Sequence, residues 1–107
     1  MIKNMLPQEL HRHLNQNPSP PLLLDVREPW EFERVHIPGS QLIPMQQIPA
    51  RLTELNPQQE IVVICHHGTR SMHVANFLVN NGFNNVINLS RGVDGWAKEV
   101  DRDLPTY

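Results

Sequence analysis

The stretch CHHGTR, residues 65–70, holds the residue types best suited to chemistry in this chain, and Cys65 is its only cysteine. The apolar run from Ile61 to Ile64 comes before this stretch, and helical spacing begins near Ser71. A tight loop between a strand and a helix gathers free backbone N–H groups at the positive end of the helix dipole. Because such surroundings favour a thiolate, Cys65 is a candidate nucleophile for covalent catalysis.

The other residues of this stretch are predicted to bind the substrate around the sulfur. Gly68 permits tight curvature of the backbone, and Thr69 can cap the following helix while its N–H joins the other loop amides. The planar guanidinium of Arg70 suits an anion with two or three oxygens, which it can hold by two parallel hydrogen bonds. His66 and His67 are expected to line the pocket mouth and, when protonated, to add positive potential.

Two other interpretations compete with a nucleophilic role for Cys65. A free thiol at the end of a strand is often an ordinary buried core residue. A zinc site with His66, His67 and His73 is the second alternative, but neighbouring residues in a tight turn are expected to point apart, and the chain has no CxxC pair. The glycine, the arginine and the helix start together favour the nucleophile, with neither a metal nor a cofactor.

Alternating strand and helix patterns place this loop at the carboxyl end of a strand, where ligands bind in open α/β sheets. Apolar runs predict strands at residues 22–26, within 36–44 after a turn, at 60–65 and at 85–89. Helical spacing predicts helices at residues 7–15, behind Pro29, behind Pro49, at 71–81 and around Trp96. The predicted fold class is therefore α/β, with a mainly parallel sheet of about five short strands and helices on both faces.

Length and composition limit the remaining possibilities. A chain of 107 residues can form one domain with a single core, but it is too short for two. Its nine Lys+Arg and eleven Asp+Glu provide no basic stripe, so nucleic acid is not an expected partner. No apolar run approaches the roughly 20 residues that span a bilayer, and the first ten residues lack a signal-peptide pattern. The expected location is the cytoplasm, with no membrane partner.

Four stretches of the chain resemble the single-domain rhodanese family of sulfurtransferases in their order and spacing: LLLDVREPWEF, HIPGS, VVICHHGTRS and NLSRGVDGW. The resemblance covers about residues 20–100, and it implies one rhodanese-like domain over residues 1–107. It also implies that CHHGTR is a six-residue active-site loop whose first residue carries a persulfide. Cys65 would then carry the sulfur, and Arg70 would help to bind thiosulfate or steer it in.

The reaction that this resemblance implies is a double displacement. The Cys65 thiolate attacks the sulfane sulfur of thiosulfate, sulfite leaves, and the persulfide passes its sulfur to cyanide or to a thiol. The chain would then be a thiosulfate sulfurtransferase, a transferase whose partners are a small-molecule donor and a cyanide or thiol acceptor. The alternative is a persulfide carrier, or a redox or sulfide sensor, that acts on a partner protein.

Loop length separates this chemistry from that of related cysteine-based phosphatases and arsenate reductases, which have one more residue between cysteine and arginine. Four residues lie between Cys65 and Arg70, so the loop suits one added sulfur atom better than a tetrahedral phosphate. Arg91 replaces the first glycine of the family's usual Gly-Gly pair, and it is predicted on the rim of the site. Asp25 and Arg27 are predicted to form an ion pair that braces the loop region, in preference to a catalytic acid and an anion site.

Overall fold

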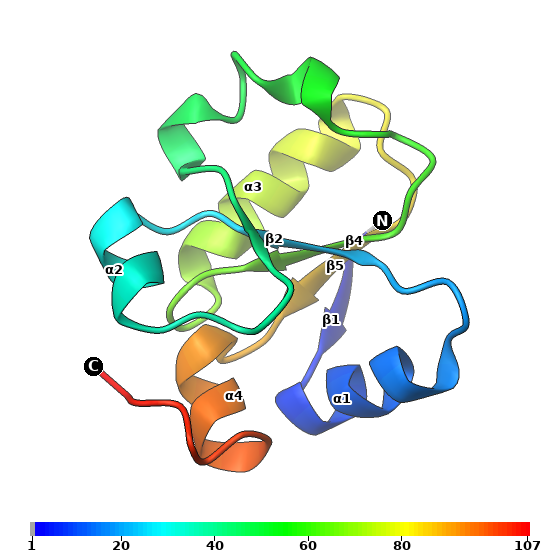
Figure 1. Ribbon diagram of the computed structural model, residues 1–107. Coiled ribbons are helices and arrows are strands. Elements are labelled where there is room, and N and C mark those ends of the chain that lie inside the picture. The colour runs from blue at the N-terminus through cyan, green and yellow to red at the C-terminus, as the bar shows by residue number, and fades with distance from the viewer. Residues whose placement is uncertain (1) are drawn as a thin grey trace.

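A five-stranded parallel sheet forms the centre of the structure, a computed structural model that describes residues 2–107 (Figure 1). The strands are β1 (Ile2–Met5), β2 (Leu22–Asp25), β3 (Gln41–Leu42), β4 (Ile61–Ile64) and β5 (Val86–Leu89). Their spatial order is β1-β5-β4-β2-β3, and every pairing between neighbours is parallel. The predicted fold class and the four strands predicted from the sequence are confirmed.

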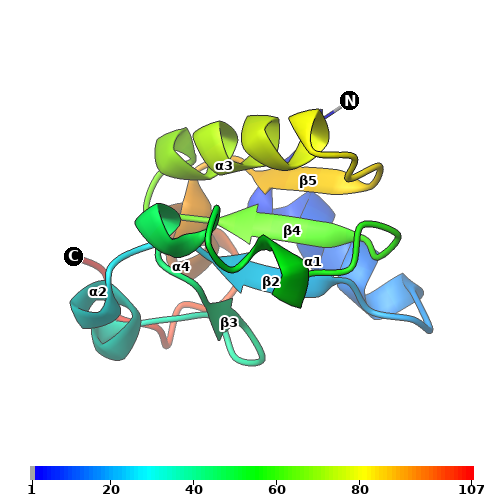
Figure 2. The same ribbon diagram turned by 90° about the horizontal axis from the view of Figure 1, so that it is seen from above.

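Helices cover both faces of this sheet, as the apolar patterns predicted (Figure 2). They are α1 (Pro7–Gln16), α2 (Pro29–Arg34), α3 (Thr69–Asn80) and α4 (Gly92–Glu99), with short 3-10 turns η1 (Met45–Gln47) and η2 (Leu52–Glu54). The fully buried β4 shows how the two layers form, because its side chains alternate between them. Ile61 and Val63 pack in the cluster that includes α3, and Val62 and Ile64 pack in the cluster that includes α1 and α4.

Three elements differ from their sequence predictions. β1 was not predicted, because the segment IKNM has no apolar run and becomes a strand only by pairing with β5. Behind Pro49 the chain forms the short 3-10 turn η2 instead of a regular α-helix, and the apolar spacing there reflects burial of Ile48 and Leu55. The helix predicted to begin at Ser71 begins at Thr69, immediately after the loop that contains Cys65.

This topology brings the carboxyl ends of β2 and β4 to one edge of the sheet. Figure 2 shows both arrowheads at the edge where α2 and the first turn of α3 lie. Residues that follow β2 and residues that follow β4 therefore meet there, although about 40 positions of sequence separate them. No helix within residues 2–107 is long and apolar enough to cross a membrane.

Candidate active site

Cys65 lies directly after β4, with only 1% of its surface exposed. The backbone N–H of Gly68 donates a hydrogen bond to its Sγ at 3.0 Å, so one of the loop amides expected to face the sulfur does so. Gly68 has a φ of +105°, and a Cβ there would lie 3.3 Å from the backbone nitrogen of Arg91. Glycine is therefore favoured on two grounds, its backbone angle and the close approach of the chain behind it.

A chain of hydrogen-bonded polar side chains, of which Ser71 and Asn88 are buried, continues from the sulfur into the sheet. The Cys65 Sγ–H donates to Ser71 Oγ at 3.2 Å, and Ser71 Oγ donates to Asn88 Oδ1 at 2.5 Å. Asn88 Nδ2 in turn donates to Asn4 Oδ1 at 3.0 Å. Sequence analysis missed this chain, although a polar Asn88 inside an apolar strand is a usable signal, because a buried amide needs partners.

The start of α4 holds the other side of the active-site loop, residues 65–70. The N–H of Val93 donates to the Cys65 carbonyl at 2.9 Å, and the N–H of Asp94 donates to the His66 carbonyl at 3.1 Å. Gly92 has a φ of +54°, and a Cβ there would lie 2.3 Å from the Cys65 carbonyl oxygen. The loop is thus fixed from behind by a backbone contact that only glycine permits.

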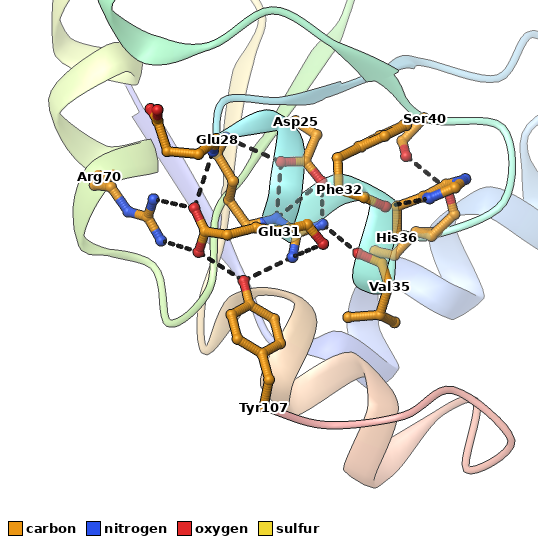
Figure 3. A network of polar contacts seen from close by, with 11 residues as sticks. Asp25, Glu28, Glu31, Phe32, Val35, His36, Ser40, Arg70 and Tyr107 are labelled. Atoms are coloured by element: carbon orange, nitrogen blue, oxygen red, sulfur yellow. Dashed lines mark hydrogen bonds and ion pairs between the residues drawn. The ribbon is translucent and has the colours of Figure 1, made fainter.

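Arg70 forms a bidentate ion pair with Glu31 of α2 (Figure 3). Its Nη1 and Nη2 donate to Glu31 Oε1 and Oε2 at 2.7 and 2.9 Å. These hydrogen bonds lower the pKa of Glu31 to about 2 against the opposing effect of its burial, and the carboxylate raises the pKa of Arg70. Glu31 was not singled out in the sequence, since its segment PWEFER resembles an ordinary surface helix. Two of the five guanidinium N–H groups are engaged, which leaves three for a ligand.

The ion pair expected between Asp25 and Arg27 is present, and both side chains are fully buried. Arg27 donates to Asp25 through Nε at 2.9 Å and through Nη2 at 2.7 Å. Burial acts to lower the pKa of Arg27, but the hydrogen bonds and charge of Asp25 outweigh it and raise that pKa. Its Nη2 also donates to the Val35 carbonyl at 2.6 Å, which ties the end of β2 to the end of α2. The bracing role stays a prediction.

The rings of His66 and His67 lie next to each other, with centroids 3.8 Å apart and planes tilted by 31°, so the expectation that they point apart is wrong. Burial, followed by the neighbouring His67, lowers the pKa of His66, which favours an uncharged ring beside the loop. Both rings and Asp94 have ligand atoms within 4.8 Å of one another, a group that could hold a metal. The Asp94 carboxylate already forms an ion pair with Lys98 at 3.0 Å. His73, the third histidine of the zinc site considered from the sequence, is not in this group, and neither is Cys65.

Two further predictions from the sequence have different outcomes. Thr69 does not cap α3, because it is the first residue of that helix and Gly68 occupies the capping position. Arg91 is largely exposed and pairs with Glu99 at 2.6 Å. It therefore lies at the surface, and its place on the rim of the site and its steering role stay predictions. Its φ of +69° explains why glycine is usual at this position in the resembling family.

The depressed pKa of Glu31 predicts a specific acid sensitivity. Because its folded pKa of about 2 lies below the ordinary 4.5, the Arg70–Glu31 pair stabilises the fold fully above pH 4.5. That contribution is lost as the pH falls from about 4.5 through about 2. Thermal unfolding of the wild type and Glu31→Gln across this range should show a stability difference that shrinks with acidity. A difference that is constant from neutral pH downward would contradict the ion pair.

Residues 6–99 match the family described as Rhodanese-like domain. One relative, the Rhodanese-like/PpiC domain-containing protein 12, chloroplastic, of Arabidopsis thaliana, is 37% identical over 113 residues. The match covers 99% of this chain and 38% of that protein, so the chain spans well under half of that relative's length. A second relative, thiosulfate sulfurtransferase GlpE of Stutzerimonas stutzeri, is 28% identical, with 96% of this chain and 92% of that protein covered.

Solved structures agree with the sequence matches. The crystal structure of a rhodanese-like domain protein from Staphylococcus aureus superposes with a TM-score of 0.83 at 30% sequence identity. The match covers 98% of this chain and 98% of that one, so the two share one fold over nearly their whole length.

Proposed function

This chain belongs to the rhodanese-like domain family, and from that premise we propose that it is a thiosulfate sulfurtransferase that works through a Cys65 persulfide. The observation that carries the proposal is the position of Cys65 Sγ, which lies at the carboxyl end of β4 and accepts the Gly68 N–H at 3.0 Å. A thiolate at a helix start with an amide donor is an activated nucleophile. The name of the Stutzerimonas relative supports thiosulfate as the donor.

The proposed reaction has two displacements with the sulfur held on Cys65 between them. First, the thiolate attacks the sulfane sulfur of thiosulfate, an S–S bond forms on Cys65, and sulfite leaves with the electron pair of the broken bond. Next, cyanide or a thiolate attacks the outer sulfur of the persulfide, and the Cys65 thiolate is regenerated as the leaving group. When Cys65 loses its proton, the Ser71 hydroxyl, 3.2 Å away, can rotate its single O–H from Asn88 Oδ1 to the sulfur.

The surroundings of the sulfur support sulfur transfer over phosphoryl transfer. Four residues separate Cys65 from Arg70, and the backbone behind the loop leaves no space for a side chain at Gly92 and little at Gly68. A loop this short suits one added sulfur atom better than a tetrahedral phosphate. The proposed location is the cytoplasm, where reducing conditions keep a free thiol available.

Steady-state kinetics with thiosulfate and cyanide test this proposal. A double displacement gives parallel lines in double-reciprocal plots at several fixed cyanide concentrations, because the two substrates never occupy the enzyme together. Intersecting lines would contradict the persulfide mechanism. A persulfide that forms stoichiometrically but turns over only with an added acceptor protein would favour the alternative of a sulfur carrier.

Arg70→Ala is expected to raise KM for thiosulfate by about tenfold to a hundredfold, because a charge-assisted pair of hydrogen bonds to the donor is lost. Arg70→Lys should restore only part of this, since an ammonium group cannot reproduce the planar fork. Arg91→Ala is the matched control on the rim. Its smaller effect should fade as salt rises, because exposed charges are screened over about 10 Å at about 0.1 M. A wild-type KM in Arg70→Ala would show that Arg70 pairs with Glu31 but does not bind the sulfur donor.

A further inference from the structure

The segment after α4 brings Tyr107 to the Arg70–Glu31 pair of the candidate active site (Figure 3). Its ring stacks on the ring of His66, with centroids 3.9 Å apart and planes inclined by 4°. Trp30 also meets Tyr107 in an edge-on arrangement, with ring centroids 5.8 Å apart and planes inclined by 72°. Tyr107 therefore contacts both the active-site loop, at the residue next to Cys65, and the first turn of α2.

The Tyr107 hydroxyl links two buried charged residues (Figure 3). It accepts a hydrogen bond from Arg27 Nη1 at 2.8 Å and donates one to Glu31 Oε2 at 2.7 Å. Burial raises the pKa of Tyr107, so the hydroxyl stays protonated at neutral pH and can donate its hydrogen bond to Glu31. Arg27 and Glu31 are 0% and 4% exposed, so water has little access to either partner of this hydroxyl.

This hydroxyl completes the set of donors around Glu31. Oε1 accepts from Arg70 and from the Glu28 N–H, and Oε2 accepts from Arg70 and from Tyr107. The hydroxyl also stands between the Arg27 guanidinium and the carboxylate. Without it, a buried N–H of Arg27 would lose its partner, Glu31 Oε2 would keep Arg70 as its remaining donor, and the opposite charges of Arg27 and Glu31 would attract each other. The carboxylate would then turn toward Arg27 and release Arg70.

We propose that Tyr107 is a positioning residue for the sulfur donor, which acts through Glu31 on the guanidinium of Arg70. By holding the carboxylate in place, Tyr107 keeps Arg70 at the start of α3 with its remaining N–H groups available to the anion. The inference rests on the proposed function, because it takes thiosulfate as the anion that Arg70 binds. Tyr107 lies 37 positions beyond Arg70 in the sequence, outside the loop motif CHHGTR.

Thiosulfate binding by the Cys65→Ser protein, measured by calorimetry, tests this role without any sulfur transfer. Adding Tyr107→Phe, which keeps the stacked ring and removes the hydroxyl, should raise the Kd for thiosulfate by about tenfold, the scale of one hydrogen bond to a charged group. Trp30→Ala is the control, since it removes the edge contact to the same ring and leaves the hydroxyl bonds in place. Its Kd should match that of Cys65→Ser alone.

A coupling measurement separates positioning from general destabilisation. If Tyr107 acts through Glu31, Tyr107→Phe should have little further effect on the Kd once Glu31→Gln is present, whereas independent effects would add. An unchanged Kd in Tyr107→Phe, full additivity with Glu31→Gln, or no thiosulfate binding by Cys65→Ser would each overturn the inference. The proposed reaction fails separately, if the wild type takes no sulfur from thiosulfate while Tyr107→Phe still weakens thiosulfate binding.

Discussion

Sulfur transfer is expected to fall by about 10⁴-fold or more in Cys65→Ser, the scale on which enzymes lose activity with their nucleophile. The reason is chemical, because a serine hydroxyl stays protonated at neutral pH and cannot take up a sulfane sulfur as a thiolate does. The rate of thiocyanate formation from thiosulfate and cyanide measures the effect.

The fold should persist in this variant. The serine hydroxyl is smaller than the thiol, and the Gly68 N–H and the Ser71 hydroxyl remain nearby as hydrogen-bond partners. Circular dichroism and thermal unfolding provide the control, since a folded but inactive protein is the expected outcome. Wild-type transfer by a folded Cys65→Ser protein would contradict the assignment of Cys65 as the sulfur carrier.

Gly92→Ala is expected to cause the largest loss of stability and to impair transfer as well. The new Cβ would lie 2.3 Å from the Cys65 carbonyl oxygen and 2.5 Å from that of His66, and both are backbone atoms that cannot turn away. The positive φ adds strain for alanine, so the free energy of unfolding should fall by at least about 2 kcal/mol. A loop displaced by about 1 Å should lower kcat/KM by about a hundredfold.

Gly82→Ala provides the matched control for this prediction. Gly82 also has a positive φ, +88°, but a Cβ there would meet nothing within 4 Å. The variant therefore isolates backbone strain, worth about 1 kcal/mol, from displacement of the loop. Activity should be unchanged in Gly82→Ala and strongly reduced in Gly92→Ala, as urea unfolding and thiosulfate kinetics would show. Equal effects on activity would mean that the contact behind Cys65 does not position the loop.

The central features of the fold could be predicted because their signals are local. The run before Cys65 is apolar at every position, and β4 is accordingly buried on both faces. The positions of Gly68 and Arg70 then mark a loop and a helix start within a few residues. β1 lacks such a signal, since its residues form a strand only through pairing with β5, more than 80 positions away.

The polar partners of the loop could not be predicted, because each is brought in from a distant segment. Glu31 reaches Arg70 across 39 positions, and Tyr107 reaches Glu31 across 76. A glutamate in a short helix and a tyrosine in an irregular segment look like surface residues in the sequence. The meeting of β2 and β4 at one edge of the sheet brings Glu31 to Arg70, and the segment after α4 brings Tyr107 to Glu31 and His66.

The most direct measurement is the intact mass of the protein after incubation with thiosulfate and removal of excess reagent. The wild type should gain the mass of one sulfur atom, the gain should map to the peptide that contains Cys65, and cyanide should reverse it. Cys65→Ser should gain nothing under the same conditions. A wild-type protein that keeps its original mass, or a Cys65→Ser protein that gains the same sulfur, would contradict persulfide transfer through Cys65.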